Sequence, residues 1–310
     1  MEYTHKPVLL KECLEGLNIR PDGVYVDGTL GRGGHSGEIV PQLTTGRLIC
    51  MDRDKAALDG AAARLEGYMD RVTLIHGTFG GLASHLDRLG IAKVDGMLFD
   101  LGVSSPQLDD GRRGFSYLQD APLDMRMDQS ANLTAREVVN HWSGTELKRI
   151  LWQYGEERYA GLIAAAIERA REQKPIETTL ELAELIRSAM PAKARREKQH
   201  PAKRSFQAIR IAVNDELGEV ERMLSSAPER LAPGGRLAVI SFHSLEDRLV
   251  KNAFFQWARG CVCPPDFPVC VCGQKPLVRL IGKRPITAGT RELEENPRAR
   301  SAKLRVAERM

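Results

Sequence analysis

The chain has 310 residues, a formal net charge of +4 and a hydrophobic content of 42%. This length accommodates one large or two ordinary domains with a sizeable core. The sequence contains no apolar run of about 18 residues that could span a bilayer, and its N-terminus lacks the basic-then-apolar order of a signal peptide. We therefore expect a cytoplasmic protein with no membrane partner. The modest charge permits a polyanionic partner without requiring one.

A glycine-rich segment, Asp27–Gly37, follows directly on the apolar run Val24–Val26 and contains five glycines. A buried strand that ends at an acidic residue, turns through glycines and continues as a helix is typical of the first unit of a nucleotide-binding α/β sheet. The spacing differs from the dinucleotide fingerprint because Ser36 stands where the third glycine would be. A tight turn without a ligand is therefore the alternative interpretation of this segment alone.

Three more apolar runs follow, at residues 47–52, 72–76 and 94–100, and each ends in a polar residue or a glycine turn. Their alternation with helical segments predicts a parallel sheet with right-handed crossovers. Ligands bind beyond the carboxyl ends of such strands. Each acidic residue alone could be a helix cap. Their occurrence in phase favours a ligand site in which Asp52 accepts the hydroxyl groups of a ribose.

The middle of the chain has a different pattern. Residues 103–132 are rich in Gly, Pro, Ser, Asp and Arg, which predicts a long loop that is functional or mobile. Residues 134–190 predict helices with no strand between them, and capping boxes mark three helix starts, at Thr134, Ser143 and Thr178. This block predicts an all-helical domain inserted into the sheet domain.

The α/β pattern resumes after this insertion. A long helix is predicted from Ser205 through Leu224, and strands at 236–241, 277–281 and 304–307 bring the sheet to about seven strands. The predicted fold class is α/β, with a mostly parallel sheet and an inserted helical domain. The predicted division is 1–105 for the first part of the sheet domain, 106–205 for the insertion and 206–310 for the second part.

Two shorter segments suggest binding sites. Residues 191–204 contain six Lys and Arg, which favours contact with nucleic-acid phosphates, although a solvated connector has the same composition. Four bunched cysteines suit a structural, tetrahedral zinc ion, although reduced thiols in a proline-rich loop are the alternative. The cysteines are Cys261, Cys263, Cys270 and Cys272.

Long motifs throughout the sequence resemble the small-subunit ribosomal RNA methyltransferase H family, also called MraW. The matching motifs are His5–Leu10, Asp27–Ser36, Asp52–Asp54, His76–Phe79, Asp100–Asp109, Gly114–Ser116, Pro122–Asp128, Tyr154–Arg158, Ser241–Arg248 and Asn296–Ser301. The resemblance implies a Rossmann-like, S-adenosylmethionine-dependent methyltransferase. It also implies methylation of the exocyclic N4 of a cytidine in the decoding region of 16S ribosomal RNA. We expect the RNA to be presented within the small ribosomal subunit.

The resemblance also implies roles for individual residues. Asp52 would hold the ribose, and Phe79 would lie against the adenine. Gly33, Gly34 and His35 would contact the methionine portion, and Asp100 and Gln107 would complete the cofactor site. The segment Ser104–Gln107 partly resembles the Asp/Asn/Ser-Pro-Pro-Tyr/Phe motif of amino-methyltransferases, although Gln107 replaces the aromatic residue.

The catalytic residues are not identified by this resemblance. Ser105, Asp109 and His243 are candidates for contacting the base, and turn or cap roles are the alternative for each. A carbon-5 pyrimidine methyltransferase is disfavoured, because it needs a cysteine nucleophile and neither Cys13 nor Cys50 ends a strand at the site. A DNA amino-methyltransferase and a non-catalytic, cofactor-regulated RNA-binding assembly factor remain alternatives.

Overall fold

The computed structural model describes residues 6–261, 263–264, 267–269 and 271–310. The chain forms two compact units, which we call the sheet unit and the helical unit. The sheet unit comprises the residues up to Gly102 and from Leu217 onward, and the helical unit comprises Val103–Glu216. The helical unit begins a few residues before the boundary predicted after residue 105. It ends at Glu216 instead of the predicted 205, so it also includes the helix Lys203–Asn214. The division into folding domains stays a prediction.

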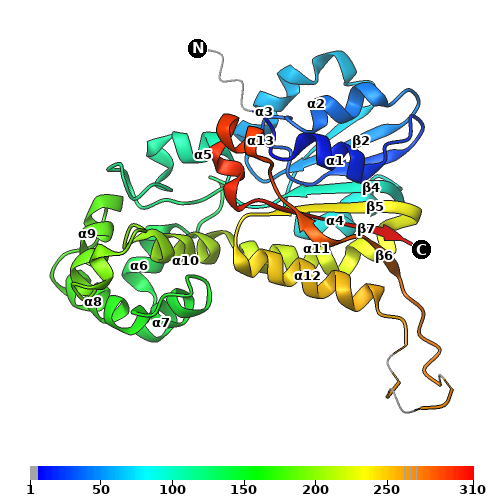
Figure 1. Cartoon of the computed structure of the whole chain (residues 1–310). Helices are drawn as coiled ribbons and strands as arrows, with labels where there is room; N and C mark the ends of the chain where they lie inside the picture. The colour runs from blue at the N-terminus through cyan, green and yellow to red at the C-terminus, as the bar shows by residue number, and fades with distance from the viewer. Residues whose placement is uncertain (1–5, 262, 265–266, 270) are drawn as a thin grey trace. The chain divides into compact units, whose positions relative to one another are not determined.

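A seven-stranded sheet organises the sheet unit (Figure 1). The strands are β1 (Val24–Asp27), β2 (Arg47–Asp52), β3 (Val72–His76), β4 (Val94–Asp100), β5 (Leu231–Ser241), β6 (Val278–Ile286) and β7 (Lys303–Arg309). Their order is β3-β2-β1-β4-β5-β7-β6. The first five strands are parallel, and β7 is antiparallel to both of its neighbours. This arrangement confirms the predicted Rossmann-like, mostly parallel sheet.

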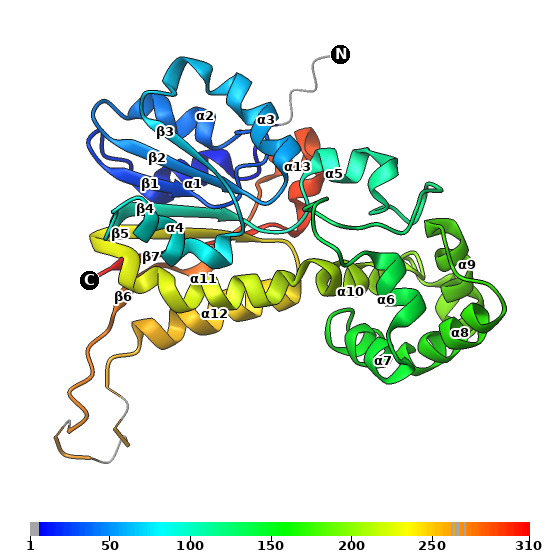
Figure 2. The same ribbon diagram turned by 180° about the vertical axis from the view of Figure 1, so that it is seen from behind.

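Helices cover both faces of this sheet. They are α1 (Leu10–Leu17), α2 (Ser36–Ile39), α3 (Lys55–Arg64), α4 (Leu82–Arg88), α11 (Glu216–Arg230), α12 (Ser244–Ala258) and α13 (Thr290–Glu295), with 3-10 turns η1 (Val40–Gln42), η2 (Glu66–Tyr68), η3 (Phe79–Gly81) and η6 (Pro297–Ser301). Helices α1, α2 and α3 pack on one face, and α4, α11 and α12 pack on the other (Figures 1 and 2). Among the described residues, no helix combines the length and the apolar character needed to cross a membrane.

Successive strand residues alternate between the two apolar cores. In β2, Leu48 and Cys50 belong to the core under α1–α3, whereas Ile49 and Met51 belong to the core under α4, α11 and α12. This alternation follows from the period of two along a strand. It explains why the central strands are continuous apolar runs in the sequence: both of their faces are buried.

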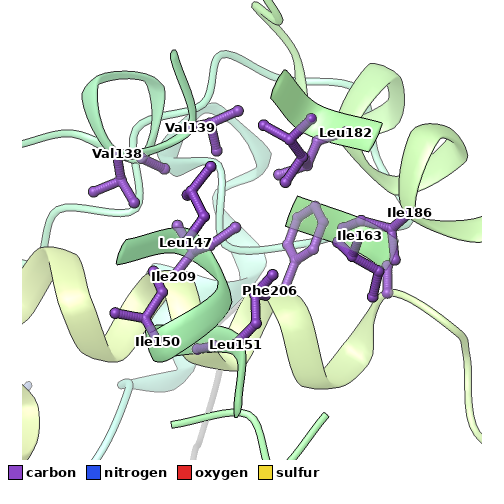
Figure 3. Close-up of a cluster of buried hydrophobic side chains, with 14 of the residues drawn as sticks. Val138, Val139, Leu147, Ile150, Leu151, Ile163, Leu182, Ile186, Phe206 and Ile209 are labelled. Carbon is purple, nitrogen blue, oxygen red and sulfur yellow. The ribbon is translucent and has the colours of Figure 1, made fainter. Parts of the chain in front are cut away.

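The helical unit has a core of its own. Its elements are α5 (Ser105–Asp109), η4 (Gly111–Arg113), α6 (Ala135–His141), α7 (Gly144–Gln153), α8 (Ala160–Gln173), α9 (Thr179–Ala189), η5 (Ala194–Arg196) and α10 (Lys203–Asn214). Leu147, Ile150 and Leu151 of α7 meet Ile163 of α8 and Phe206 of α10 in this core (Figure 3). The capping boxes predicted at Ser143 and Thr178 are both present.

The prediction of one long helix from Ser205 through Leu224 is wrong. Helix α10 ends at Asn214, Asp215 adopts a left-handed conformation with φ of 49°, and α11 begins at Glu216. Asp tolerates this conformation better than most residues. The apolar periodicity continues through the break, so the sequence pattern did not indicate it.

Candidate functional site

The sheet order changes direction between β1 and β4, because β2 and β3 lie on one side of β1 and β5 lies beyond β4. Open α/β sheets bind ligands at such a switch point, beyond the carboxyl ends of the strands. Asp27 and Asp100 are the last residues of β1 and β4. The Asp100 N–H donates to the Thr29 hydroxyl at 2.6 Å, which joins the two strand ends. We call this region, formed by the residues that end or follow β1, β2, β3 and β4, the carboxyl edge.

The glycine-rich loop follows β1 at this edge. Gly31 and Gly33 have positive φ angles of 53° and 73°, which glycine adopts without steric cost. The Leu30 N–H donates to the Met51 carbonyl at 2.9 Å, so the loop is anchored on β2. A Cβ atom at Gly34 would lie 2.8 Å from Cγ of Pro7. Gly34 is therefore required for packing of the N-terminal segment, and its predicted cofactor contact stays a prediction.

Asp52, the last residue of β2, connects two loops of the carboxyl edge. Its carboxylate accepts hydrogen bonds from the Gly31 N–H at 2.7 Å and from the Asp54 N–H at 2.8 Å. Burial raises the pKa of Asp52 to about 6, and the backbone hydrogen bonds oppose this shift. A carboxylate has about four acceptor positions, so these two bonds leave capacity for the hydroxyl groups of a ribose.

His35 and Asp100 face each other across the switch point. His35 Nε2 lies 3.0 Å from the Val8 carbonyl oxygen. A carbonyl can only accept, so Nε2 carries the proton. Burial lowers the pKa of His35 to about 4, which leaves Nδ1 unprotonated, 4.0 Å from Asp100 Oδ2. The ring is therefore neutral and presents a lone pair toward Asp100.

Asp100 is the most perturbed carboxyl group of this edge. Burial, followed by the charges of Asp27 and Glu246, raises its pKa to about 8. Its Oδ1 atom is buried and has no hydrogen-bond partner among the residues that the structure describes, although the side chain as a whole retains 26% exposure. A buried polar atom without a partner costs free energy, so this oxygen is suited to a donor or cation on a ligand.

A buried polar network lies beneath the glycine-rich loop. The Ser36 hydroxyl donates to Asp27 Oδ2 at 2.6 Å and lies 3.3 Å from Cys50 Sγ. Burial raises the pKa of Asp27 to about 6 and raises the pKa of the Cys50 thiol far above its usual range. Cys50 is therefore a protonated thiol inside the core, which agrees with the argument against a cysteine nucleophile.

Phe79 begins η3, the turn that follows β3, and packs edge-on against Phe99 with ring centroids 5.7 Å apart. Glu219 of α11 supports this turn, because its buried carboxylate accepts from the Gly80 N–H at 2.7 Å and lies 3.6 Å from the Arg53 guanidinium. No role was predicted for Glu219 or Arg53. Their contact joins helix α11 to loops far away in the sequence, and no local pattern signals it.

The remaining predicted site residues have local structural roles. In the helical unit, Gln107 is buried and its side-chain oxygen accepts from the Ser104 N–H at 3.0 Å. Ser105 begins the same short helix and Asp109 ends it. In the sheet unit, His243 precedes α12, and its Nδ1 accepts from the Glu246 N–H at 3.4 Å. The proposed contacts of these residues with cofactor or base stay predictions.

Part of the loop predicted at 103–132 is held by buried hydrogen bonds within the helical unit. The Arg113 guanidinium donates to the carbonyls of Arg126 and Met127, both at 2.9 Å. The Asn214 amide of α10 accepts from the Met127 N–H at 2.8 Å and donates to the Met125 carbonyl at 2.7 Å. These bonds fix the segment against α10.

The basic segment 191–204 is largely exposed in the helical unit. Ala194 is buried, and the charged residues around it are exposed, namely Lys193, Arg195, Arg196 and Lys198. His200 stacks on Tyr117 with ring centroids 4.5 Å apart. The segment is therefore attached at Ala194 and His200, and it presents several cations to solvent.

Three of the four cysteines predicted to bind zinc, Cys261, Cys263 and Cys272, have Sγ atoms within 4.8 Å of one another. Cys270 lies outside the described residues.

A mostly parallel Rossmann-like sheet with a glycine-rich loop and acidic strand ends is typical of the nucleotide-binding class of α/β proteins. A family model described as "MraW methylase family" matches residues 2–310. The chain belongs to this family. It is 57% identical over 315 residues to "Ribosomal RNA small subunit methyltransferase H" of Paenibacillus sp. (strain JDR-2), covering 99% of this chain and 100% of the relative. The protein of the same name from Symbiobacterium thermophilum is 56% identical over 306 residues, covering 98% of this chain and 96% of the relative.

Among solved structures, the chain is similar to an rRNA methylase from Streptococcus thermophilus, with 11% identity and a TM-score of 0.40, covering 99% of this chain and 98% of that one.

Proposed function

We propose that this protein uses S-adenosyl-L-methionine to methylate N4 of one cytidine, cytosine 1402 by family resemblance, in the decoding region of 16S ribosomal RNA. The family and the names of the relatives support rRNA methylation as the activity. The structural support for a methyl donor of this kind comes from the hydrogen bonding of two carboxyl groups at the carboxyl edge. There Asp52 has acceptor capacity left and the Asp100 carboxyl has a buried oxygen without a partner among the described residues.

The residues of the carboxyl edge fit the proposed cofactor in chemical type. Asp52 would accept the ribose hydroxyls, and Phe79 would offer an apolar ring face to the adenine. His35 and Asp100 would lie with Gly33 and Gly34 at the methionine portion. S-adenosylmethionine supplies an electrophilic methyl group and two positive charges, on the sulfonium and the ammonium. A carboxylate at Asp100 would interact favourably with such a cation.

The protein must then align the acceptor amine with the methyl group. The lone pair of cytidine N4 is delocalised into the ring, so a side chain that accepts a hydrogen bond from the amine would favour the reactive geometry and help remove its proton. Ser105, Asp109 and His243 are the candidates. His243 is the candidate of the sheet unit, whereas Ser105 and Asp109 belong to the helical unit.

A cytidine stacked within folded RNA cannot present its amine to a cofactor at a sheet edge. We therefore propose that the base is splayed out of the RNA, which costs a few kcal/mol of stacking. Contacts of the basic segment 191–204 with phosphates would offset this cost. A shaped target, such as the assembled small subunit, suits a binding surface built by an inserted unit better than a free strand.

The experiment that tests the function compares acceptors. Protein and labelled S-adenosylmethionine are incubated with small ribosomal subunits from cells lacking the protein, with naked 16S RNA and with DNA, and nucleosides are then identified by mass spectrometry. N4-methylcytidine in 16S RNA supports the proposal. Methylated DNA with unmodified RNA would favour the DNA amino-methyltransferase. Cofactor and RNA binding without turnover on any acceptor would favour the assembly factor.

A further inference from the structure

A segment of the sheet unit, residues 259–277, leaves the end of α12 and returns to β6, and we call it the cysteine hairpin. It extends away from the sheet (Figure 1), and its described residues form no helix or strand. The side chains of Phe267, Val269 and Val271 are 49%, 70% and 73% exposed. Burial therefore contributes little to offset the conformational entropy of ordering this segment. A disulfide or a metal ion is one way to order a short chain that has no hydrophobic core of its own.

The thiols of the hairpin have the spacing of metal ligands. Cys261 Sγ and Cys272 Sγ are 3.7 Å apart, and Cys263 Sγ lies within 4.8 Å of both. Zinc–sulfur bonds of about 2.3 Å in a tetrahedron place the sulfurs about 3.8 Å apart. Cys261 and Cys263 on the outgoing arm of the hairpin and Cys272 on the returning arm are therefore close enough to occupy three corners of such a tetrahedron.

Backbone N–H groups point at these sulfurs. The Cys263 N–H lies 3.3 Å from Cys261 Sγ, and the Val271 N–H lies 3.3 Å from Cys263 Sγ. Contacts of this kind orient the ligands of a metal ion. The other two described cysteines provide a contrast. Cys13 and Cys50 are fully buried in the core, and burial raises the pKa of both thiols, so they stay protonated.

We propose that Cys261, Cys263 and Cys272 bind a zinc ion that joins the two arms of the cysteine hairpin. Thiolates in tetrahedral geometry select zinc over the hard cations magnesium and calcium, which prefer oxygen ligands. The site belongs to the hairpin and is separate from the carboxyl edge, so its role is to order the hairpin. The fourth coordination position is left unassigned.

The first test is metal content. The full-length protein, purified without chelator and without a metal-binding tag, should contain about one zinc per chain by elemental analysis. Replacing the metal with cobalt(II) should give the visible absorption of a tetrahedral cobalt thiolate. Cys261→Ser and Cys272→Ser should each lose most of the zinc. The control Val269→Ser changes an exposed side chain of the same hairpin and should retain it.

A second measurement separates ordering of the hairpin from global folding. Limited proteolysis should cut residues 259–277 faster after chelation of the metal, while the circular dichroism of the protein stays unchanged. Protein that holds no stoichiometric zinc as purified or after zinc addition would overturn the proposal. So would iron in place of zinc, a disulfide between Cys261 and Cys272 detected by mass, or full zinc retention in the Cys261→Ser/Cys272→Ser variant.

Discussion

At the scale of single residues, the carboxyl edge combines three acidic side chains whose pKa values are raised by burial, to about 6 for Asp27 and Asp52 and about 8 for Asp100. Asp27 and Asp52 have backbone or hydroxyl donors. Asp100 alone of the three has an oxygen for which the described residues offer no donor. These carboxyl groups are therefore not equivalent. We expect substitution and pH to affect cofactor binding and stability differently at each of them.

Asp52→Ala should greatly weaken binding of S-adenosylmethionine while the fold remains intact. Each hydrogen bond to a charged group is worth about 1.5–3 kcal/mol, so loss of the ribose contacts should raise the Kd at least tenfold, by about 1.4 kcal/mol or more. Calorimetry measures the Kd. The control Asp59→Ala removes an exposed carboxylate of α3. An unchanged Kd for Asp52→Ala would remove this residue from the site.

Asp100 should make cofactor binding depend on pH. Its pKa of about 8 means that the carboxyl group is mostly protonated at neutral pH, whereas a cationic ligand binds better to the ionised form. The affinity for S-adenosylmethionine should therefore fall as pH is lowered from about 8, by up to about tenfold per pH unit, and binding at neutral pH should release protons. Calorimetry in buffers with different ionisation enthalpies measures both effects. Asp100→Asn should bind weakly with little pH dependence; an equal slope in the variant would contradict the assignment.

The same raised pKa affects the stability of the protein without ligand. The folded state holds the Asp100 proton up to a pH of about 8, whereas an unfolded Asp releases it near its ordinary value of 3.8. The folded state therefore binds more protons between these values, and its free energy of unfolding should fall as pH rises through this window. Asp100→Asn should reduce this loss. Urea unfolding at several pH values checks the sign, and a wild-type protein that becomes more stable between about pH 6 and 8 would contradict it.

At the scale of elements, the insertion starts and ends at the carboxyl edge of the sheet unit. Gly102 follows Asp100 closely, and near the return of the chain Glu219 of α11 bonds to the Gly80 N–H of η3. Within the insertion, η5 carries exposed cations on a segment attached at Ala194. An exposed basic segment can bind RNA phosphates without being part of the cofactor site.

Neutralising Lys193, Arg195, Arg196 and Lys198 together should weaken binding to the small ribosomal subunit and flatten its salt dependence. For each phosphate that the protein no longer neutralises, the slope of log K against log salt should become shallower by about 0.7–0.9. The affinity for S-adenosylmethionine should not change. Filter binding or fluorescence titration across a salt series measures the slope.

A matched comparison controls for net charge. Arg195→Ala/Arg196→Ala in the basic segment should reduce the salt slope, whereas Lys148→Ala/Arg149→Ala, two exposed cations of α7 in the same unit, should not. Equal methylation rates for the wild-type protein and the quadruple variant at every salt concentration would identify the segment as a solvated connector.

At the scale of the whole molecule, the two units have separate hydrophobic cores. The cluster of α6–α10 draws its residues from the insertion, and the two clusters of the sheet unit draw theirs from the chain before and after it. A cavity in one core should therefore destabilise that unit in particular, because the van der Waals contacts that are lost belong to the atoms that line the cavity.

Leu151→Ala, in the core of the helical unit, should cost about 2–5 kcal/mol. Hydrogen exchange should become faster in α6–α10 and stay unchanged in β1, β2 and β4. Leu162→Ala in α8 makes the same chemical change at a position that is 53% exposed, and it should have little effect. Equal acceleration across both units would show that the chain unfolds as one cooperative body.

Sequence patterns alone determined the strands, many helix starts and the fold class. Strands β2 and β3 have the bounds that their apolar runs predicted, and Ser143 and Thr178 cap their helices as expected. These features depend on neighbours within a few positions, so they are visible locally. The strand ends also predicted that Asp52 and Asp100 lie at one edge of the sheet, because the carboxyl ends of parallel strands share that edge. Their contacts with a cofactor stay predictions.

Only the tertiary structure decided which atoms of the site have partners. The burial of the Asp100 oxygen, the support of η3 by Glu219 and the approach of Cys272 to Cys261 each depend on how segments pack in three dimensions. The break at Asp215 likewise interrupts an apolar pattern that continues unchanged. Hydrogen-bond satisfaction, burial and pKa depend on distances between such segments. Periodicity along the sequence does not contain those distances, because they arise only when the segments pack together.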